Sequence, residues 1–323
     1  MSDKKGNNDG GFMKFLYNSD TGEVLGRTGM SWLKIIVFYI IFYAGLAAFF
    51  GLMLYIFYQT LDINKPKYQL GDSLIGSNPG VGFRPQPDQD KNVDSTLIWF
   101  KRGDRDDFKF WSEQLKSYVE EARKTAGKNC DFGADKASDK EACQVIVDEK
   151  KFGNCTVATD FGYKDGSPCV LIKLNRIYGW KPEPFGPARF SEAEFKKAID
   201  DKANSDAKFP KILKTAIEKK LQEVNTEAAK EDVAKSVWIN CDGENPADRE
   251  NMGKISYAPM QAIQSFYFPF MKQPNYVSPF IMVQFESVTR GVLINIECKA
   301  YAKNIFPDRA SRTGSVHFEL MVE

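Results

Sequence analysis

The chain has 323 residues, of which 44 are basic and 43 acidic, so its formal net charge is +1. That balance excludes the clearly positive face on which nucleic-acid binding usually depends. The hydrophobic share is 43%, slightly low for a packed globule, and one region near the N-terminus concentrates it heavily.

The N-terminal part predicts a membrane-spanning helix. Residues 1–12 are polar and rich in Gly and Asn, which predicts disorder, and residues 13–34 form a juxtamembrane segment that contains Trp32. Residues 35–58 carry no charge and would form a helix about 36 Å long, enough to cross a hydrocarbon core of about 30 Å. Because the run is too long for the apolar core of a cleaved signal peptide, we expect a transmembrane helix at 35–58.

The cysteines orient this helix. An even set lies after it and none lies before or within it: Cys130, Cys143, Cys155, Cys169, Cys241 and Cys298. Such a set predicts disulfides in an oxidising compartment, and the sequon at Asn154 lies on the same side. The basic residues next to the helix are too evenly divided to decide its direction. We therefore expect a type II protein, with residues 1–34 as a cytoplasmic tail and the C-terminal domain outside.

Beyond the helix, residues 59–95 contain many Pro, Gly and Asn, which predicts an extended stalk or linker before an outer domain at 96–323. An amphipathic helix is predicted at 107–126, because apolar residues recur there at spacings of three and four. The residues of this stripe are Phe108, Trp111, Leu115, Tyr118, Val119 and Ala122.

A helical insertion is predicted at 190–235. Ser191 and Glu194 fit a capping box, and Pro210 is suited to be the first residue of a further helix. The apolar face of that further helix is formed by Leu213, Ala216, Ile217, Leu221 and Val224. Most of the charge in this insertion is expected on a solvated face.

The rest of the outer domain predicts strands, which are rich in β-branched and aromatic residues and are bounded by Gly, Pro and Asn: 97–100, 170–174, 237–241, 280–285, 292–301 and 316–322. Alternation along 292–301 places Cys298 on the buried face. Cys241 ends another strand, so a Cys241–Cys298 bridge could tie two sheets together, as in immunoglobulin-like domains. The expected fold class is α+β, an immunoglobulin-like antiparallel β-sandwich plus helices.

The catalytic and metal-binding motifs found in the sequence have little support as functional sites. Gly71-Asp72-Ser73-Leu74 matches one esterase signature, but its serine lies in the linker and the chain's single histidine is His317. We interpret His317 as an ordinary strand residue. The cysteines contain no C-x-x-C pair, which argues against zinc, and no phosphate-binding loop or phosphorylation loop is present. We expect no catalytic residue, no metal and no cofactor.

The most serious enzymatic alternative is a type II glycosyltransferase. Asp104-Arg105-Asp106 has the D-x-D form with which many such enzymes bind a metal–nucleotide-sugar complex. However, these aspartates lie just before the helix predicted at 107–126, where acidic residues cap a helix and complement its dipole. The stalk also occupies the space that preceding α/β units would need.

The transmembrane helix itself predicts a partner. Tyr39 and Tyr43 lie one turn apart, and Phe42, Gly45 and Phe49 form a neighbouring stripe. Ala44 and Ala48 add a small-xxx-small spacing, which is common where helices pack in membranes. Tyr43 lies deeper than the interfacial aromatic belt, and a phenol in hydrocarbon requires a hydrogen-bond partner.

Several blocks of this sequence resemble the Na,K-ATPase β subunits (the X,K-ATPase β family), and the chain looks like an insect-type, nervana-like member. The blocks span most of the chain in family order: 15–19, 25–29 and 31–32 before the helix, 38–43 within it, and 162–169, 173–176, 181–182 and 296–301 beyond it. The helical insertion at 190–235 is longer than in vertebrate members, and only one sequon, at Asn154, is available for a glycan.

The resemblance implies a noncatalytic subunit of the plasma membrane that assembles with a P-type ATPase α subunit. In that family, the subunit permits the folding and surface delivery of α and modulates sodium and potassium transport. The resemblance also implies the pairs Cys130–Cys143, Cys155–Cys169 and Cys241–Cys298, and contact of Tyr39 and Tyr43 with an α-subunit helix, with the Gly45 stripe facing another helix. A small regulatory single-span subunit is a further partner to consider, and an adhesion or junction role of the outer domain is the main alternative.

Overall fold

The computed structural model describes residues 15–18, 21–88, 90, 95–125, 127–134, 136–138, 140–145, 147–187, 190–205 and 209–323. The segment 1–12, for which the sequence predicts disorder, lies outside the described residues. The chain divides into two compact units, Met1–Ile63 and Asn64–Glu323.

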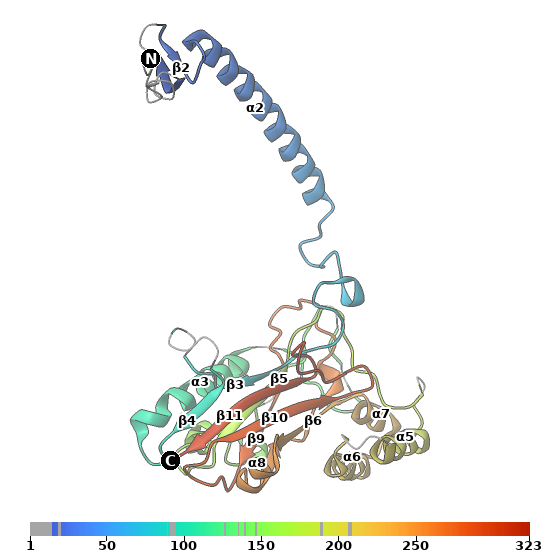
Figure 1. Ribbon diagram of the computed structural model, residues 1–323. Helices are drawn as coiled ribbons and strands as arrows, with labels where there is room; N and C mark the ends of the chain where they lie inside the picture. Colours follow the sequence, from blue (N-terminus) through green and yellow to red (C-terminus); the bar gives the residue numbers. More distant parts are fainter. Residues whose placement is uncertain are drawn as a thin grey trace, which may run out of the picture. The chain divides into compact units, whose positions relative to one another are not determined.

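The first unit contains a short hairpin and one long helix (Figure 1). The hairpin pairs β1 (Tyr17–Asn18) with β2 (Glu23–Val24), and the helix is α2 (Gly29–Gln59). This helix begins before the expected residue 35, since the backbone N–H groups of its first turn bond to the carbonyl of Thr28. Among the described helices, α2 alone is long and apolar enough to cross a membrane, as the sequence predicts for a single-pass membrane protein.

The second unit contains two packed sheets (Figure 1). The five-stranded sheet has the order β4-β11-β10-β6-β8, with β4 (Leu97–Phe100), β11 (Ser315–Val322), β10 (Ile294–Tyr301), β6 (Val237–Gly243) and β8 (Ala262–Ile263). The four-stranded sheet has the order β3-β5-β9-β7, with β3 (Val81–Arg84), β5 (Cys169–Leu174), β9 (Phe280–Phe285) and β7 (Ile255–Ala258). All neighbouring pairs are antiparallel except β4 and β11, which are parallel.

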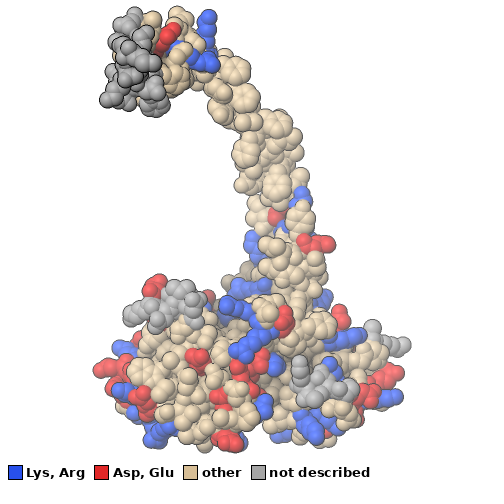
Figure 2. All heavy atoms as spheres, in the orientation of Figure 1, with Lys and Arg blue, Asp and Glu red and all other residues tan. Residues whose placement is uncertain are grey.

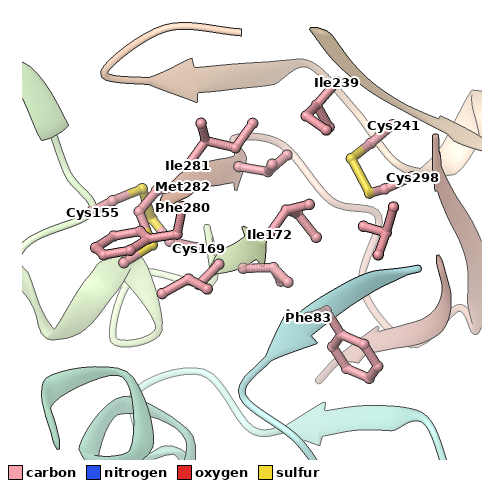
Figure 3. Packing of buried hydrophobic residues seen from close by; sticks show 14 of the residues in the cluster. Phe83, Cys155, Cys169, Ile172, Ile239, Cys241, Phe280, Ile281, Met282 and Cys298 are labelled. Atoms are coloured by element: carbon pink, nitrogen blue, oxygen red, sulfur yellow. A yellow bond between two sulfur atoms is a disulfide. The ribbon is translucent and has the colours of Figure 1, made fainter. Parts of the chain in front are cut away.

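Aromatic side chains join the inner faces of the two sheets. The ring of Phe318 in β11 lies 5.1 Å from that of Phe83 in β3 and 6.1 Å from that of Phe285 in β9, measured between centroids. All three side chains are buried. Figure 3 shows Phe83, Ile172 and, from β9, Phe280, Ile281 and Met282 in the same interior as two of the disulfides. Burial of this apolar surface is the main stabilising contribution to such a domain.

In the second unit, the strands predicted from the sequence are confirmed, with ends that agree or differ by one or two residues, but β3, β7 and β8 were missed, as was the β1–β2 hairpin of the first unit. β3 lies inside the segment 59–95 that was expected to be a stalk or linker. Val81 and Phe83 are buried, and β3 pairs with β5, so the packed domain includes the end of that segment. The glycine at 82 and the nearby prolines hide this strand, because their abundance is more typical of a linker.

The Cys241–Cys298 disulfide does not tie two sheets together, and that expectation was wrong. The two cysteines are direct partners on β6 and β10, neighbouring strands of the five-stranded sheet, with 3.9 Å between their Cα atoms. Alternation correctly placed Cys298 on the buried face, but it could not show which strand lies beside it. The other disulfides join Cys130 to Cys143 and Cys155 to Cys169.

Helices cover the sheets. The amphipathic helix is α3 (Arg105–Lys124), and the apolar stripe predicted for it is confirmed as buried except for the half-buried Tyr118. The short helices are α4 (Glu149–Phe152) and α8 (Pro246–Asn251), with 3-10 turns η1 (Leu70–Asp72), η2 (Val157–Gly162) and η3 (Ser265–Tyr267).

The segment 190–235 contains three helices with a core of their own, α5 (Glu192–Ser205), α6 (Lys211–Glu223) and α7 (Glu227–Ala234). Leu213, Ile217 and Leu221 are buried as the spacing predicts. Pro210 is the N-cap of α6, one position before the first helical residue where it was expected, because its extended backbone precedes the helix. This core also includes Trp238 of β6 and Ala262 of β8, so the helices pack on that edge of the five-stranded sheet.

Acid should weaken the attachment of α8 to the sheet. Both backbone N–H and side-chain amide groups of Asn245 and Asn295 donate to the buried carboxylate of Asp248, at 2.9–3.3 Å. Burial alone would raise the pKa of Asp248, but these hydrogen bonds outweigh it and hold the pKa below its ordinary value. Because the pKa is lower in the folded chain than its ordinary value of about 3.9, the ionised carboxylate stabilises the fold at pH values above about 3.9. This stabilisation is lost as the pH falls below that value.

Asp248→Asn should therefore lower the free energy of unfolding by roughly 1–3 kcal/mol near neutral pH, since it disrupts buried hydrogen bonds. The difference from the unchanged chain should shrink below about pH 4. Denaturant titrations of both chains at several pH values measure this. A difference that stays constant over the whole pH range would contradict the role given to the ionised carboxylate.

Candidate functional site

The strongest candidate site is the aromatic face of α2. The rings of Tyr39 and Tyr43 stack with centroids 5.9 Å apart, and those of Phe38 and Phe42 stack at 6.2 Å. Residues four apart lie one above the other on a helix, which is why each pair is in contact. The ring of Phe42 also meets that of Tyr43 edge to face at 5.5 Å, so these residues form one continuous aromatic surface.

Among the residues that the structure describes, none packs over this surface to bury it. No residue of α2 is buried, and the side chains of Tyr39 and Tyr43 are 48% and 59% exposed. Phe42 and Phe49 are exposed as well, and a Cβ added to Gly45 would meet nothing within 4 Å. In a bilayer, lipid tails satisfy apolar rings but cannot accept hydrogen bonds from two phenols. The surface is therefore suited to a second helix with polar or small residues.

The two alanines of the small-xxx-small spacing lie on a different face of α2. A helix turns about 100° per residue, which places Ala44 and Ala48 roughly opposite Tyr39. The predicted set on α2 thus separates into the tyrosine pair, the adjacent stripe of Phe42, Gly45 and Phe49, and this small-residue face. In Figure 2 the middle of the helix is free of charged residues, which is expected of a membrane span.

A further feature of this unit was not recognised from the sequence. The indole N–H of Trp32 donates to the carbonyl of Val24 at 2.9 Å, which joins the hairpin to the first turn of α2. Phe15 lies within 3.5 Å of the Cβ position of Gly26, whose left-handed backbone suits glycine. The sequence placed Trp32 at the membrane interface, but it gave no sign of this contact across the turn.

The residues considered for catalysis do not form an active site. The hydroxyl of Ser73 donates to the carbonyl of Leu70 at 2.8 Å, within its own turn. His317 lies on β11, where its Nδ1 is 2.5 Å from a carboxylate oxygen of Glu244. The two groups thus have separate partners, and the esterase motif has no support.

The D-x-D aspartates act at the start of α3. Asp104 is its N-cap, and its side chain accepts a hydrogen bond from the backbone N–H of Asp106 at 3.1 Å. Among the described residues, no group of three His, Cys, Asp or Glu side chains could hold a metal ion. The arrangement fits helix capping.

Asn154 is exposed beside a hydrogen-bonded turn. It precedes Cys155, which is buried and bonded to Cys169, and its carbonyl accepts a hydrogen bond from the Thr159 hydroxyl at 2.6 Å. The sequon threonine, Thr156, is only 8% exposed and its hydroxyl meets that of Thr159. In the folded chain, the threonine that an oligosaccharide-transferring enzyme must reach is therefore largely covered.

Comparisons with known proteins cover nearly the whole chain. A family model described as sodium / potassium ATPase beta chain matches residues 2–318. The sodium/potassium-transporting ATPase subunit beta-2 of Drosophila melanogaster is 37% identical over 318 residues, covering 96% of this chain and 91% of that relative. The beta-1 subunit of the same organism is 35% identical over 317 residues, covering 97% and 93%. The human beta-2 subunit is 28% identical over 329 residues, covering 96% and 93%.

Proposed function

The chain belongs to the sodium/potassium ATPase β-chain family, and from that premise we propose that it assembles with the catalytic α subunit of a P-type cation pump. It is the noncatalytic β subunit, which supports the folding, assembly and plasma-membrane delivery of α and modulates sodium and potassium transport. The observation that carries the proposal is the unpartnered aromatic face of α2. Hydroxyls that can donate across helices, together with small residues nearby, favour the packing of a partner helix in the membrane.

Within this proposal, Tyr39 and Tyr43 contact one helix of the α subunit, and the stripe of Phe42, Gly45 and Phe49 faces another. The stacked tyrosines support this assignment, because each ring restrains the other and leaves its hydroxyl to a neighbour. The opposite face, with Ala44 and Ala48, leaves room for a small regulatory single-span subunit.

We infer a type II orientation at the plasma membrane, with residues 1–34 cytoplasmic and the disulfide-bonded domain extracellular. The support is chemical: all three disulfides lie beyond α2, and such bonds persist in oxidising compartments. Asn154, exposed on the same domain, is the proposed glycosylation site. Because Thr156 is largely covered in the folded chain, we infer that the glycan is added before this turn folds.

Affinity purification of the full-length chain from mild detergent tests the assembly. We expect a P-type ATPase α subunit of about 100 kDa to be recovered with it, a size that follows from the family. Glycosidase treatment of the same preparation should lower the mass of the chain if Asn154 lies outside. Recovery of the chain without any P-type ATPase, from cells that express one, would contradict the proposal.

A further inference from the structure

Three cations lie together on the outer face of the four-stranded sheet. Lys173 in β5 is the register partner of Gly82 in β3, and Arg84 lies two residues further along β3, so both side chains project from the same face. That face is the outer one, because Phe83 points the other way, toward Phe318 of the other sheet. Arg176 follows the end of β5, and we call Arg84, Lys173 and Arg176 the basic cluster.

Aromatic rings hold two of these cations in place. The ammonium nitrogen of Lys173 lies 4.9 Å from the centroid of the Tyr118 ring on α3. The guanidinium carbon of Arg176 lies 5.6 Å from the ring of Phe270 and 5.4 Å from that of Tyr276. Such contacts satisfy one face of a cation and leave its N–H groups directed elsewhere.

The polar contacts that the cluster makes with described residues leave most of its donors unused. Arg176 donates from Nε to the hydroxyl of the buried Ser278 at 2.8 Å, which fixes the plane of the guanidinium. Arg84 donates to the side-chain carbonyl of Gln86 at 3.1 Å. An arginine carries five N–H donors and a lysine three, so several remain for a ligand.

Carboxylates lie near the cluster: Asp88 and Asp90 line the same hollow as Arg84, and the charge of Glu121 acts on Lys173. In the part of the chain that the structure describes, none of its three members forms an ion pair, although many other surface lysines do, such as Lys196, whose Nζ lies 2.7 Å from Glu192. Burial lowers the pKa of Lys173, and the positive charges of Arg84 and Arg176 lower it further, while Glu121 opposes them. On a chain with a net charge of +1, three cations held at one place are a local concentration of positive charge.

We propose that the basic cluster binds a tetrahedral oxyanion of the sulfate or phosphate type. The free donors come from three side chains on two strands and the turn after them, which suits an anion whose oxygens point in several directions. The anion is either a free ion or a sulfate ester carried on an extracellular polysaccharide. The second source rests on the proposed topology, whereas the binding chemistry does not.

Calorimetric titration of the purified full-length chain at low ionic strength tests the site. Inorganic sulfate is one probe, and a heparin-derived tetrasaccharide is the other. In the variant K173Q/R176Q, we expect the affinity for whichever probe binds to fall by about tenfold or more, because two charge-assisted contacts are lost. The matched control is K150Q/K151Q, which removes the same charge from two exposed lysines of α4 and should leave the affinity within about twofold.

Binding of inorganic sulfate that the cluster variant loses supports a free-ion site, and binding of the tetrasaccharide alone supports the ester form. If neither probe binds, or if both variants reduce binding equally, the proposal is overturned. R176Q alone serves as a second variant, since Arg176 is exposed. Because this variant loses the hydrogen bond to the buried Ser278, its unfolding temperature is measured as well, and a loss of binding by a chain that is still folded supports the site. The titration uses the chain without an α subunit, so failure of the assembly proposal would not affect its outcome.

Discussion

Removal of the Cys241–Cys298 disulfide should destabilise the outer domain by roughly 2–5 kcal/mol and stop delivery of the chain to the cell surface. The bridge joins β6 and β10 inside the five-stranded sheet, and both cysteines are buried. It spans 57 residues, so it strongly restricts the unfolded chain. In Cys298→Ser, a hydroxyl and a leftover thiol occupy that interior, which adds a desolvation cost.

Denaturant unfolding of the purified variant measures the lost stability, and glycan processing with surface labelling measures its delivery. We expect Cys298→Ser to be retained in the endoplasmic reticulum and to retain the α subunit with it. The matched comparison is loss of the Cys130–Cys143 bridge, which spans only 13 residues and should cost about 1 kcal/mol less in chain entropy. Normal stability and surface delivery of Cys298→Ser would refute the importance assigned to this bridge.

Features with a regular period were predictable from the sequence. The uncharged run at 35–58 requires only its length and composition to be recognised as a span, and α2 contains all of it. The stripe of α3 is formed by residues three and four apart, and it packs into the core as expected. Strands β9 and β4 have the predicted bounds, because turn-forming residues mark their ends.

Features that depend on which segments become neighbours were not predictable. The sequence showed that Cys241 and Cys298 both lie in strands, but one sheet or two was equally compatible with that pattern. β8 is only two residues long, and its pairing with β6 decides its structure. Short strands carry too few residues for a two-residue period to be detected.

The aromatic face of α2 and the basic cluster also differ in how far the sequence predicts them. The aromatic face of α2 is a local pattern, so Tyr39 and Tyr43 could be identified before the structure was known, although their contact with α remains a proposal. The basic cluster contains Arg84 and Arg176, and Arg176 contacts the rings of Phe270 and Tyr276. Only the pairing of β3 with β5 and the packing of α3 bring these residues together, and no sequence motif marks them.

Replacing Tyr39 and Tyr43 with alanine should reduce the recovery of the α subunit by about tenfold or more. Each tyrosine contributes ring packing and a hydroxyl, which finds no hydrogen-bond acceptor among lipid tails. Interhelical hydrogen bonds of this kind contribute about 1 kcal/mol each. The outer domain should keep its unfolding temperature, since α2 and that domain are separate compact units. Quantitative co-purification from mild detergent provides the measurement.

Two further variants show which property of the face matters. Tyr39→Phe with Tyr43→Phe keeps the stacked rings and removes the hydroxyls, so an intermediate loss would show that both contribute. Tyr55→Ala with Tyr58→Ala removes two exposed tyrosines from other faces near the end of α2 and should leave recovery nearly unchanged. If the Tyr39 and Tyr43 alanine variant still recovers α normally, another face of α2 or the outer domain must provide the contact. An equal loss in both alanine pairs would show that the helix requires aromatic anchors generally, because tyrosines near an interface also fix the depth of a span.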